Sequence, residues 1–184
     1  MSYKLLPDMA VLDAETTYGL PPHVTAMTGV DAMIHALEAY TGKNLKNPLS
    51  DIYARSGLEI MSKNLLTCMD EPLNAEARSA MLYGSFLAAT AFCNSPVSGV
   101  HALAYPLALK YHVPHGLSNS LMLPEVMRFN APACGHQYDE ILALMHDVDP
   151  AHLGDKDGQG LVWYFEDLIE KLGLPYNLKG ISTP

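Results

Sequence analysis

The chain has 184 residues, a length typical of one domain with a sizeable buried core. Its 49% hydrophobic and 17% charged residues exclude a disordered protein, because a disordered chain lacks the apolar groups that offset chain entropy. Asp and Glu number 20 against 11 for Lys and Arg, and the resulting net charge of −9 argues against nucleic acid and membrane surfaces as partners.

The elements expected along the chain are almost all helices. Residues 10–12 are the one strand-like run, and a turn follows at Leu20-Pro21-Pro22. Apolar residues spaced by threes and fours then predict a first helix from Val24 to Gly42 and a second from Pro48 to Leu65. Five further helices are expected, at 75–92, 98–109, 115–129, 137–147 and 161–172. Asn74 would cap the first of these, and the second is expected despite Pro106. Pro132 follows the end of the third, and Gly173 follows the end of the last.

This pattern predicts an all-α fold with at most one short N-terminal strand. We find no internal repeat or linker and therefore treat residues 1–184 as a single helical domain. The sequence has no GxGxxG motif, no Walker glycines and no strand–helix–strand alternation. We therefore assign no cofactor-binding residue within this chain.

Cysteine spacing and the N-terminus indicate a reduced, soluble protein of the cytoplasm. Cys68, Cys93 and Cys134 are widely spaced and form no CxxC pair, so we expect neither a disulfide framework nor a thiolate zinc site. The N-terminal stretch lacks the apolar segment of a signal peptide. No apolar run reaches the roughly 20 residues of a membrane span, so no membrane partner is expected.

Histidine and carboxylate spacing points to a metal site. Asp31 and His35 are four residues apart on a predicted helix, which places both on one face, although such a pair is also common as a surface hydrogen bond. His101, His112 and His115 follow within fifteen residues and are flanked by apolar groups. A single buried histidine usually pairs with a backbone carbonyl, but several converging candidates favour a divalent ion. One oxygen and three nitrogen donors suit Fe²⁺ or Zn²⁺.

Several motifs, in order, resemble one family. GVDAMIHALEAYTG, NPLSD, FCNSPVSGVHALAYPL and YHVPHGLSNSLMLPEVMRFN closely resemble the C-terminal helical domain of the iron-containing (group III) alcohol dehydrogenases, over about residues 9–175. The resemblance implies the multihelical fold of the dehydroquinate synthase-like helical domain. It also implies that the catalytic divalent metal, with Fe²⁺ preferred over Zn²⁺, is bound by Asp31, His35, His101 and His115.

The resemblance and the spacing differ over His112, and we follow the resemblance. The segment from Pro106 to Pro114 must turn the chain before His115 can return to the ion, so we expect His112 to face outward or to line the cleft. The other histidines are expected in loops or in solvent: His23, His136, His146 and His152.

Tyr105 is the expected catalytic residue. It stands where many family members have the second histidine of HALAHPLG, which lies close to the nicotinamide and handles the substrate proton. A tyrosine still forms hydrogen bonds, but a phenol is a poorer base than an imidazole at neutral pH. A purely packing role for Tyr105 stays open. Analogy alone places Asn94, Val97 and Phe129 on the substrate side.

The activity that the resemblance implies is hydride transfer between a small alcohol or aldehyde and NAD(P), with the metal polarising the substrate oxygen. Family members begin with an α/β domain that binds the cofactor, and neither this domain nor the final helices are found in these residues. We therefore expect a domain fragment, from a truncated or split gene, that is inactive alone. NAD(P) would bind only through a separate cofactor-domain chain, and the fragment itself would form a homo-oligomer.

Two other readings stay open. A metal-dependent hydrolase or lyase would use the same four ligands with bound water and a general base such as Glu38. A non-catalytic helical assembly domain would use any metal only as a structural element.

Overall fold

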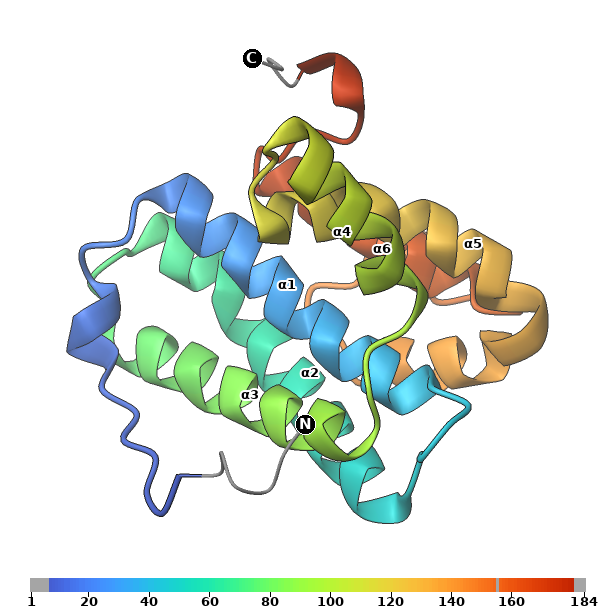
Figure 1. Ribbon diagram of the computed structural model, residues 1–184, viewed down its shortest axis with the longest axis horizontal. Helices are drawn as coiled ribbons and strands as arrows, with labels where there is room; N and C mark the ends of the chain where they lie inside the picture. The colour runs from blue at the N-terminus through green and yellow to red at the C-terminus, as the bar shows by residue number, and fades with distance from the viewer. Residues whose placement is uncertain (1–6, 155, 181–184) are drawn as a thin grey trace.

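A computed structural model describes residues 7–154 and 156–180, and this part of the chain is helical without a strand (Figure 1). The α-helices are α1 (Pro22–Thr41), α2 (Pro48–Asp70), α3 (Ala75–Asn94), α4 (Gly99–Tyr111), α5 (His115–Leu142) and α6 (Gln159–Lys171). Short 3₁₀-helices are η2 (Ala14–Thr17), η3 (Pro150–His152) and η4 (Leu178–Gly180). The prediction of an all-α fold is confirmed.

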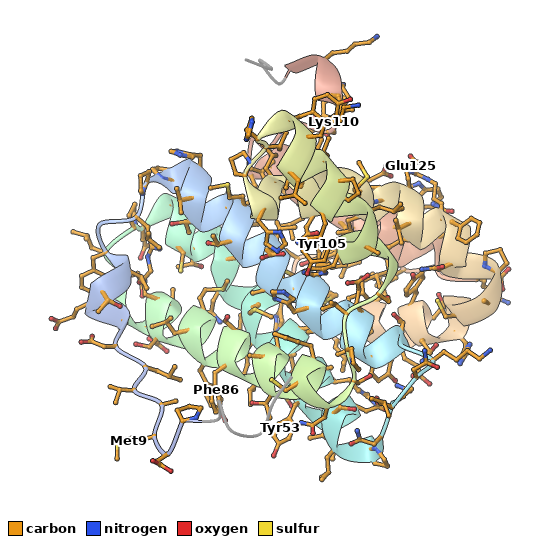
Figure 2. All side chains as sticks on the ribbon, viewed as in Figure 1. Met9, Tyr53, Phe86, Tyr105, Lys110 and Glu125 are labelled. Atoms are coloured by element: carbon orange, nitrogen blue, oxygen red, sulfur yellow. The ribbon has the colours of Figure 1, made fainter. Side chains whose placement is uncertain are left out.

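The strand-like run at residues 10–12 forms no regular structure and is exposed. Met9, just before it, projects from the N-terminal segment into solvent (Figure 2). An apolar run needs a neighbouring strand to satisfy its backbone groups, and the described residues offer none.

Local capping explains where two helices begin. Asn47 accepts a hydrogen bond from the backbone N–H of Ser50 (3.0 Å), and Ser50 Oγ accepts one from the N–H of Asn47 (3.3 Å), which forms a capping box in front of α2. The side chain of Asn74 accepts from the N–H of Ala77 (3.0 Å) and caps α3, as predicted.

Helix α5 covers two predicted helices that a kink separates. We expected one helix to end at Phe129 and another to begin at Gln137, and between them the backbone leaves helical geometry at Cys134 (φ −132°, ψ 20°). The first part therefore runs a few residues past Phe129 before the break. A proline removes one backbone hydrogen bond and kinks a helix, and Pro132 lies two residues before the break. The second predicted segment also ends early, at Leu142 rather than Asp147.

Helix α1 joins the two halves of the molecule. It packs against α2 and α3 on one side and against α5 and α4 on the other, and it crosses the middle of the bundle in Figure 1. The apolar residues of α1, such as Val30, Met33 and Ile34, are therefore fully buried. No helix among the described residues is long and apolar enough to cross a membrane.

Candidate metal centre

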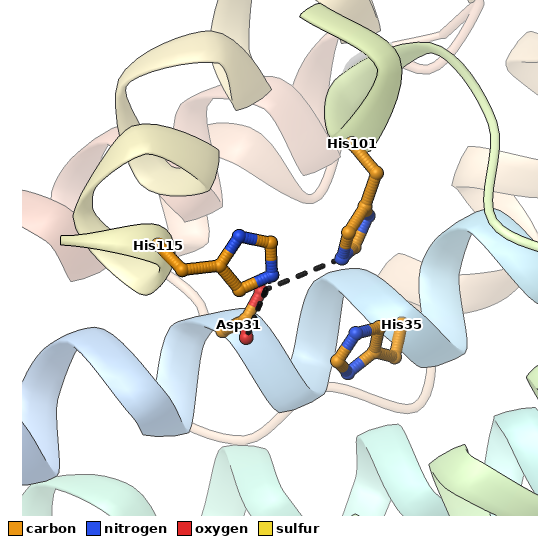
Figure 3. Close-up of side chains that lie close together, drawn as sticks. All are labelled: Asp31, His35, His101 and His115. Atoms are coloured by element: carbon orange, nitrogen blue, oxygen red, sulfur yellow. Dashed lines mark ion pairs between the residues drawn. The ribbon is translucent and has the colours of Figure 1, made fainter. Parts of the chain in front are cut away.

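The four sequence-predicted ligands lie together although they come from three different helices (Figure 3). Asp31 and His35 project from adjacent turns of α1, His101 from the first turn of α4, and His115 from the first residue of α5. One donor atom of each residue lies within 4.8 Å of those of the other three. The fold thus brings one carboxylate and three imidazoles to a single point.

Asp31 is the centre of this group, and the group is open on one side. Its Oδ1 lies 3.6 Å from His101 Nε2, and its Oδ2 lies 3.8 Å from His115 Nε2. The side chain of His101 is only 2% exposed, whereas that of His115 is 45% exposed. Solvent or a small molecule can therefore approach the group from the side of His115.

His35 is held between two rings. Its imidazole stacks on Phe92 (4.7 Å between ring centroids) and on His101 (4.6 Å). Burial lowers the pKa of His35 below its ordinary value; Asp31 opposes this shift and His101 adds to it. The neutral imidazole that results is the form that donates a lone pair to a metal ion.

Glu38 determines which nitrogen of His101 carries the proton. The buried Glu38 carboxylate pairs through Oε2 with His101 Nδ1 (2.6 Å), and its Oε1 accepts from the N–H of Val100 (2.6 Å) and from Ser98 Oγ (3.1 Å). Burial alone raises the pKa of Glu38, but these hydrogen bonds outweigh it and lower the pKa below its ordinary value. The ionised carboxylate keeps the proton on Nδ1 and leaves the lone pair of Nε2 directed at Asp31.

His101 Nε2 is one of the buried side-chain atoms in the described residues that have no hydrogen-bond partner. A buried acceptor without a partner costs free energy, and such atoms in native proteins usually have a function or a bound ligand. A divalent ion between Asp31 and the three imidazoles would occupy this lone pair, so the residues present fit a metal site.

The same contacts bear on the hydrolase reading. Both oxygens of Glu38 are engaged, with His101 on one side and with Val100 and Ser98 on the other. The side chain is also buried, whereas a general base must reach a water molecule. These observations favour a role for Glu38 in orienting His101 over the role of general base in a hydrolase.

Asn119 is a site residue that we did not single out in the sequence. It is fully buried on α5, one turn after His115, and its Nδ2 donates to Asp31 Oδ1 (2.5 Å) and lies 3.2 Å from His115 Nε2. Its Oδ1 has no partner within the described part of the chain. The spacing of four residues between His115 and Asn119 was the available signal, because it places both on one face of a helix.

Tyr105 borders the open side of the group. It lies on α4, one turn after His101. Its ring stacks on His115 (5.8 Å between centroids, 13° between planes) and meets His101 edge-on at 6.3 Å. The residue is 49% exposed, which makes a purely core-packing role a poor description of it.

The residues placed on the substrate side by analogy are more peripheral. Asn94 and Phe129 are exposed, and Val97 is half-buried. The amide of Asn94 donates to the carbonyl of Thr90 within α3 (2.9 Å).

The other histidines lie apart from the four ligands. His112 is exposed at the C-terminal end of α4 with φ 54°, and His23 and His136 are exposed as expected. His146 is half-buried in a loop. The expectation for His152 was wrong: it lies half-buried in η3, 3.3 Å from Asp167, because its ring packs against Trp163.

Comparison with known proteins shows the family of this chain. The model of the family described as "Fe-containing alcohol dehydrogenase family, C-terminal" matches residues 25–183. Long-chain-alcohol dehydrogenase 1 of Geobacillus thermodenitrificans (strain NG80-2) is 36% identical over 180 residues, which cover 98% of this chain and 45% of the relative.

Two solved structures match nearly all of this chain. An iron-containing alcohol dehydrogenase from Thermococcus thioreducens matches with a TM-score of 0.83 and 31% identity, over 95% of this chain and 43% of that protein. A sulfoacetaldehyde reductase from Bifidobacterium kashiwanohense, solved in complex with NAD+, matches with a TM-score of 0.83 and 30% identity, over 97% of this chain and 45% of that protein. The chain thus spans less than half the length of these relatives.

Proposed function

The chain belongs to the iron-containing alcohol dehydrogenase family, and from this premise we propose that it is the metal-binding part of an enzyme that interconverts a small alcohol and its aldehyde with NAD(P). The observation that carries the proposal is the buried Nε2 of His101, which has no hydrogen-bond partner in the described residues and faces the other three donors. An alcohol dehydrogenase needs an electrophile at the substrate oxygen, and this donor set would hold one.

Iron is our first choice for the ion and zinc the second. One carboxylate and three imidazoles suit both metals, and the family description favours iron. When bound, such an ion acts as a Lewis acid that polarises the oxygen of an alcohol or aldehyde.

The chain's own residues would position this centre. Asp31 contributes the only negative charge among the four donors and so offsets part of the charge of a divalent ion. Glu38 holds His101 in the tautomer that presents Nε2, and Asn119 orients Asp31 by donating to Oδ1. His115, on the exposed side, leaves room for a substrate next to Tyr105.

We assign Tyr105 to the proton of the substrate hydroxyl. A phenol beside His115 can donate a hydrogen bond to the substrate oxygen or accept one from it. The nicotinamide we assign to a separate α/β domain, because these residues contain no glycine-rich loop that would bind its phosphates.

Metal binding tests the centre directly. We expect the chain to bind one equivalent of Co²⁺, seen by its visible absorption, and to lose this binding in Asp31→Ala and His115→Ala. The matched control is His112→Asn, at an exposed histidine outside the group, which should bind as the wild type does. Full occupancy in both ligand variants would contradict the assignment.

A chimera tests the activity. The matching segment of the Geobacillus relative is replaced by this chain, and NADH oxidation with aldehyde substrates is measured. We expect activity that Asp31→Ala abolishes, while NADH should not bind to the 184-residue chain alone at micromolar concentration. A folded, metal-loaded chimera without activity, next to an active parent, would refute the proposed dehydrogenase function.

A further inference from the structure

Arg78 is a buried cation away from the metal centre. It is 4% exposed and is the fourth residue of α3. Its Nε donates to the carbonyl of Pro72 (2.9 Å) and its Nη1 to Thr25 Oγ1 (3.0 Å). Both partners are neutral, and they use only two of the five N–H groups of the guanidinium.

The charge of Arg78 has no carboxylate beside it. Within residues 7–154 and 156–180, no acidic side chain forms an ion pair with it. Glu76, the nearest acidic residue on its own helix, is exposed. The first turn of α3 does not offset the positive charge of Arg78, because the N-terminal end of a helix is itself electropositive. Buried charges are normally paired, so this one calls for an anion.

A pocket lies against Arg78. It has a volume of about 140 Å³ and is lined by residues of α1, α2, α3 and the segment around η2. Its polar groups include Arg78 and the hydroxyl of Ser85, and its apolar wall includes Leu20, Met81 and Leu82. A cavity of about 150 Å³ holds a molecule the size of benzene, so this pocket has room for about six heavy atoms.

We propose that this pocket binds a short-chain aliphatic monocarboxylate of the size of butanoate. The carboxylate would pair with the free N–H groups of Arg78, since a guanidinium binds carboxylates with strong, charge-assisted hydrogen bonds. The hydrocarbon tail would lie against Leu20, Met81 and Leu82. A single charged group in a mostly apolar pocket favours a ligand with one charged end and one apolar end. The site involves neither the metal ligands nor the proposed dehydrogenase activity.

Ligand titration of the 184-residue chain, without added metal, tests the proposal. Binding of butanoate is followed by saturation-transfer NMR, with 1-butanol as the uncharged analogue. We expect one saturable site for butanoate and none for butanol. Arg78→Met should weaken butanoate binding at least tenfold. Arg55→Met, at an exposed arginine, is the matched control and should leave it unchanged.

A second variant keeps the test decisive if Arg78→Met does not fold. Ser85→Leu retains the charge and fills the pocket from the half-buried face of α3, so it should also abolish butanoate binding. Circular dichroism verifies that each variant is folded. The proposal is refuted if the wild type shows no saturable binding, if Ser85→Leu binds as the wild type does, or if chloride competes as well as butanoate and so identifies an adventitious ion only.

Discussion

At the scale of single residues, the contact between Glu38 and His101 shows how a neighbouring carboxylate prepares a histidine to bind a metal ion. The imidazole of a free histidine exchanges its proton between two nitrogens, and only the nitrogen without a proton can bind a metal. The 2.6 Å contact with Glu38 selects Nδ1 for the proton and leaves Nε2 for the ion. Carboxylate–histidine pairs of this kind tune metal affinity without contacting the metal.

We predict that Glu38→Gln weakens metal binding by about 10- to 100-fold while all four donors stay in place. The amide keeps the shape of the side chain but lacks the charge that holds the proton on Nδ1. Competition with a chromophoric chelator measures the change in affinity. Glu59→Gln, at an exposed position of α2, is the control and should bind metal like the wild type. Equal affinity in the two variants would mean that Glu38 has only a packing role.

At the scale of elements, the glycine that follows His115 lets two helices touch. A Cβ atom on Gly116 would lie 2.5 Å from the carbonyl oxygen of Met27 and 2.9 Å from its carbonyl carbon. The first turn of α5 therefore lies directly against the backbone of α1, one helical turn before Asp31. This close approach brings His115 to Asp31.

We predict that Gly116→Ala lowers the free energy of unfolding by about 1–3 kcal/mol, the usual effect of overpacking, and also weakens metal binding. The added methyl group pushes α5 away from α1 and takes His115 with it. Urea denaturation and metal titration measure the two effects. Gly19→Ala, where a Cβ would meet no atom within 4 Å, should change neither. Unchanged metal affinity in Gly116→Ala would show that the contact does not position the ligand.

A hydrogen bond between α1 and α5 predicts that the folded state loses stability at high pH. The hydroxyl of Tyr40 on α1 donates to Glu140 on α5, and burial together with this carboxylate raises the pKa of Tyr40 to about 12. In the unfolded chain the phenol ionises near pH 10. The unfolded state therefore loses its proton first as the pH rises, so the stabilisation is complete below pH 10 and is lost between pH 10 and 12.

We accordingly expect Tyr40→Phe to reduce the slope of unfolding free energy against pH over this range. Urea denaturation at several pH values from 9 to 12 gives the slope, and Tyr53→Phe, at an exposed tyrosine, serves as the control. A slope that is the same in Tyr40→Phe and in the wild type would contradict the assignment.

At the scale of the whole molecule, apolar side chains remain exposed on the helix that carries His101. Leu103, Leu109 and Tyr111 of α4 are exposed, Leu109 by 79%, and Tyr105 lies between them. Exposed apolar surface of this kind is a common site of association, whereas the net charge of −9 limits unspecific aggregation.

We therefore predict a small, defined oligomer whose population grows with concentration. Light scattering at several concentrations measures the mass. Leu109→Asp, which places a charge on the exposed face of α4, should shift the population to the monomer. Lys63→Asp changes the charge at an exposed position of another helix, α2, and should leave the mass unchanged. A monomer at every concentration would overturn the prediction.

The sequence by itself determined the helical class, most helix starts and the pair of Asp31 and His35 as candidate ligands. These features depend on residues close together along the chain: the spacing of Asp31 and His35 on one helix, or the capping of α3 by Asn74. The motifs around His101 and His115 added the other two candidates through the family resemblance. Local patterns of this kind do not depend on how the helices pack against one another.

The tertiary structure alone decided the partners of Glu38, Asn119 and Arg78. Glu38 pairs with His101, 63 residues away, and Asn119 donates to Asp31, 88 residues away. No local pattern reveals such partners, because hydrogen bonds, burial and cavities arise from where whole helices pack.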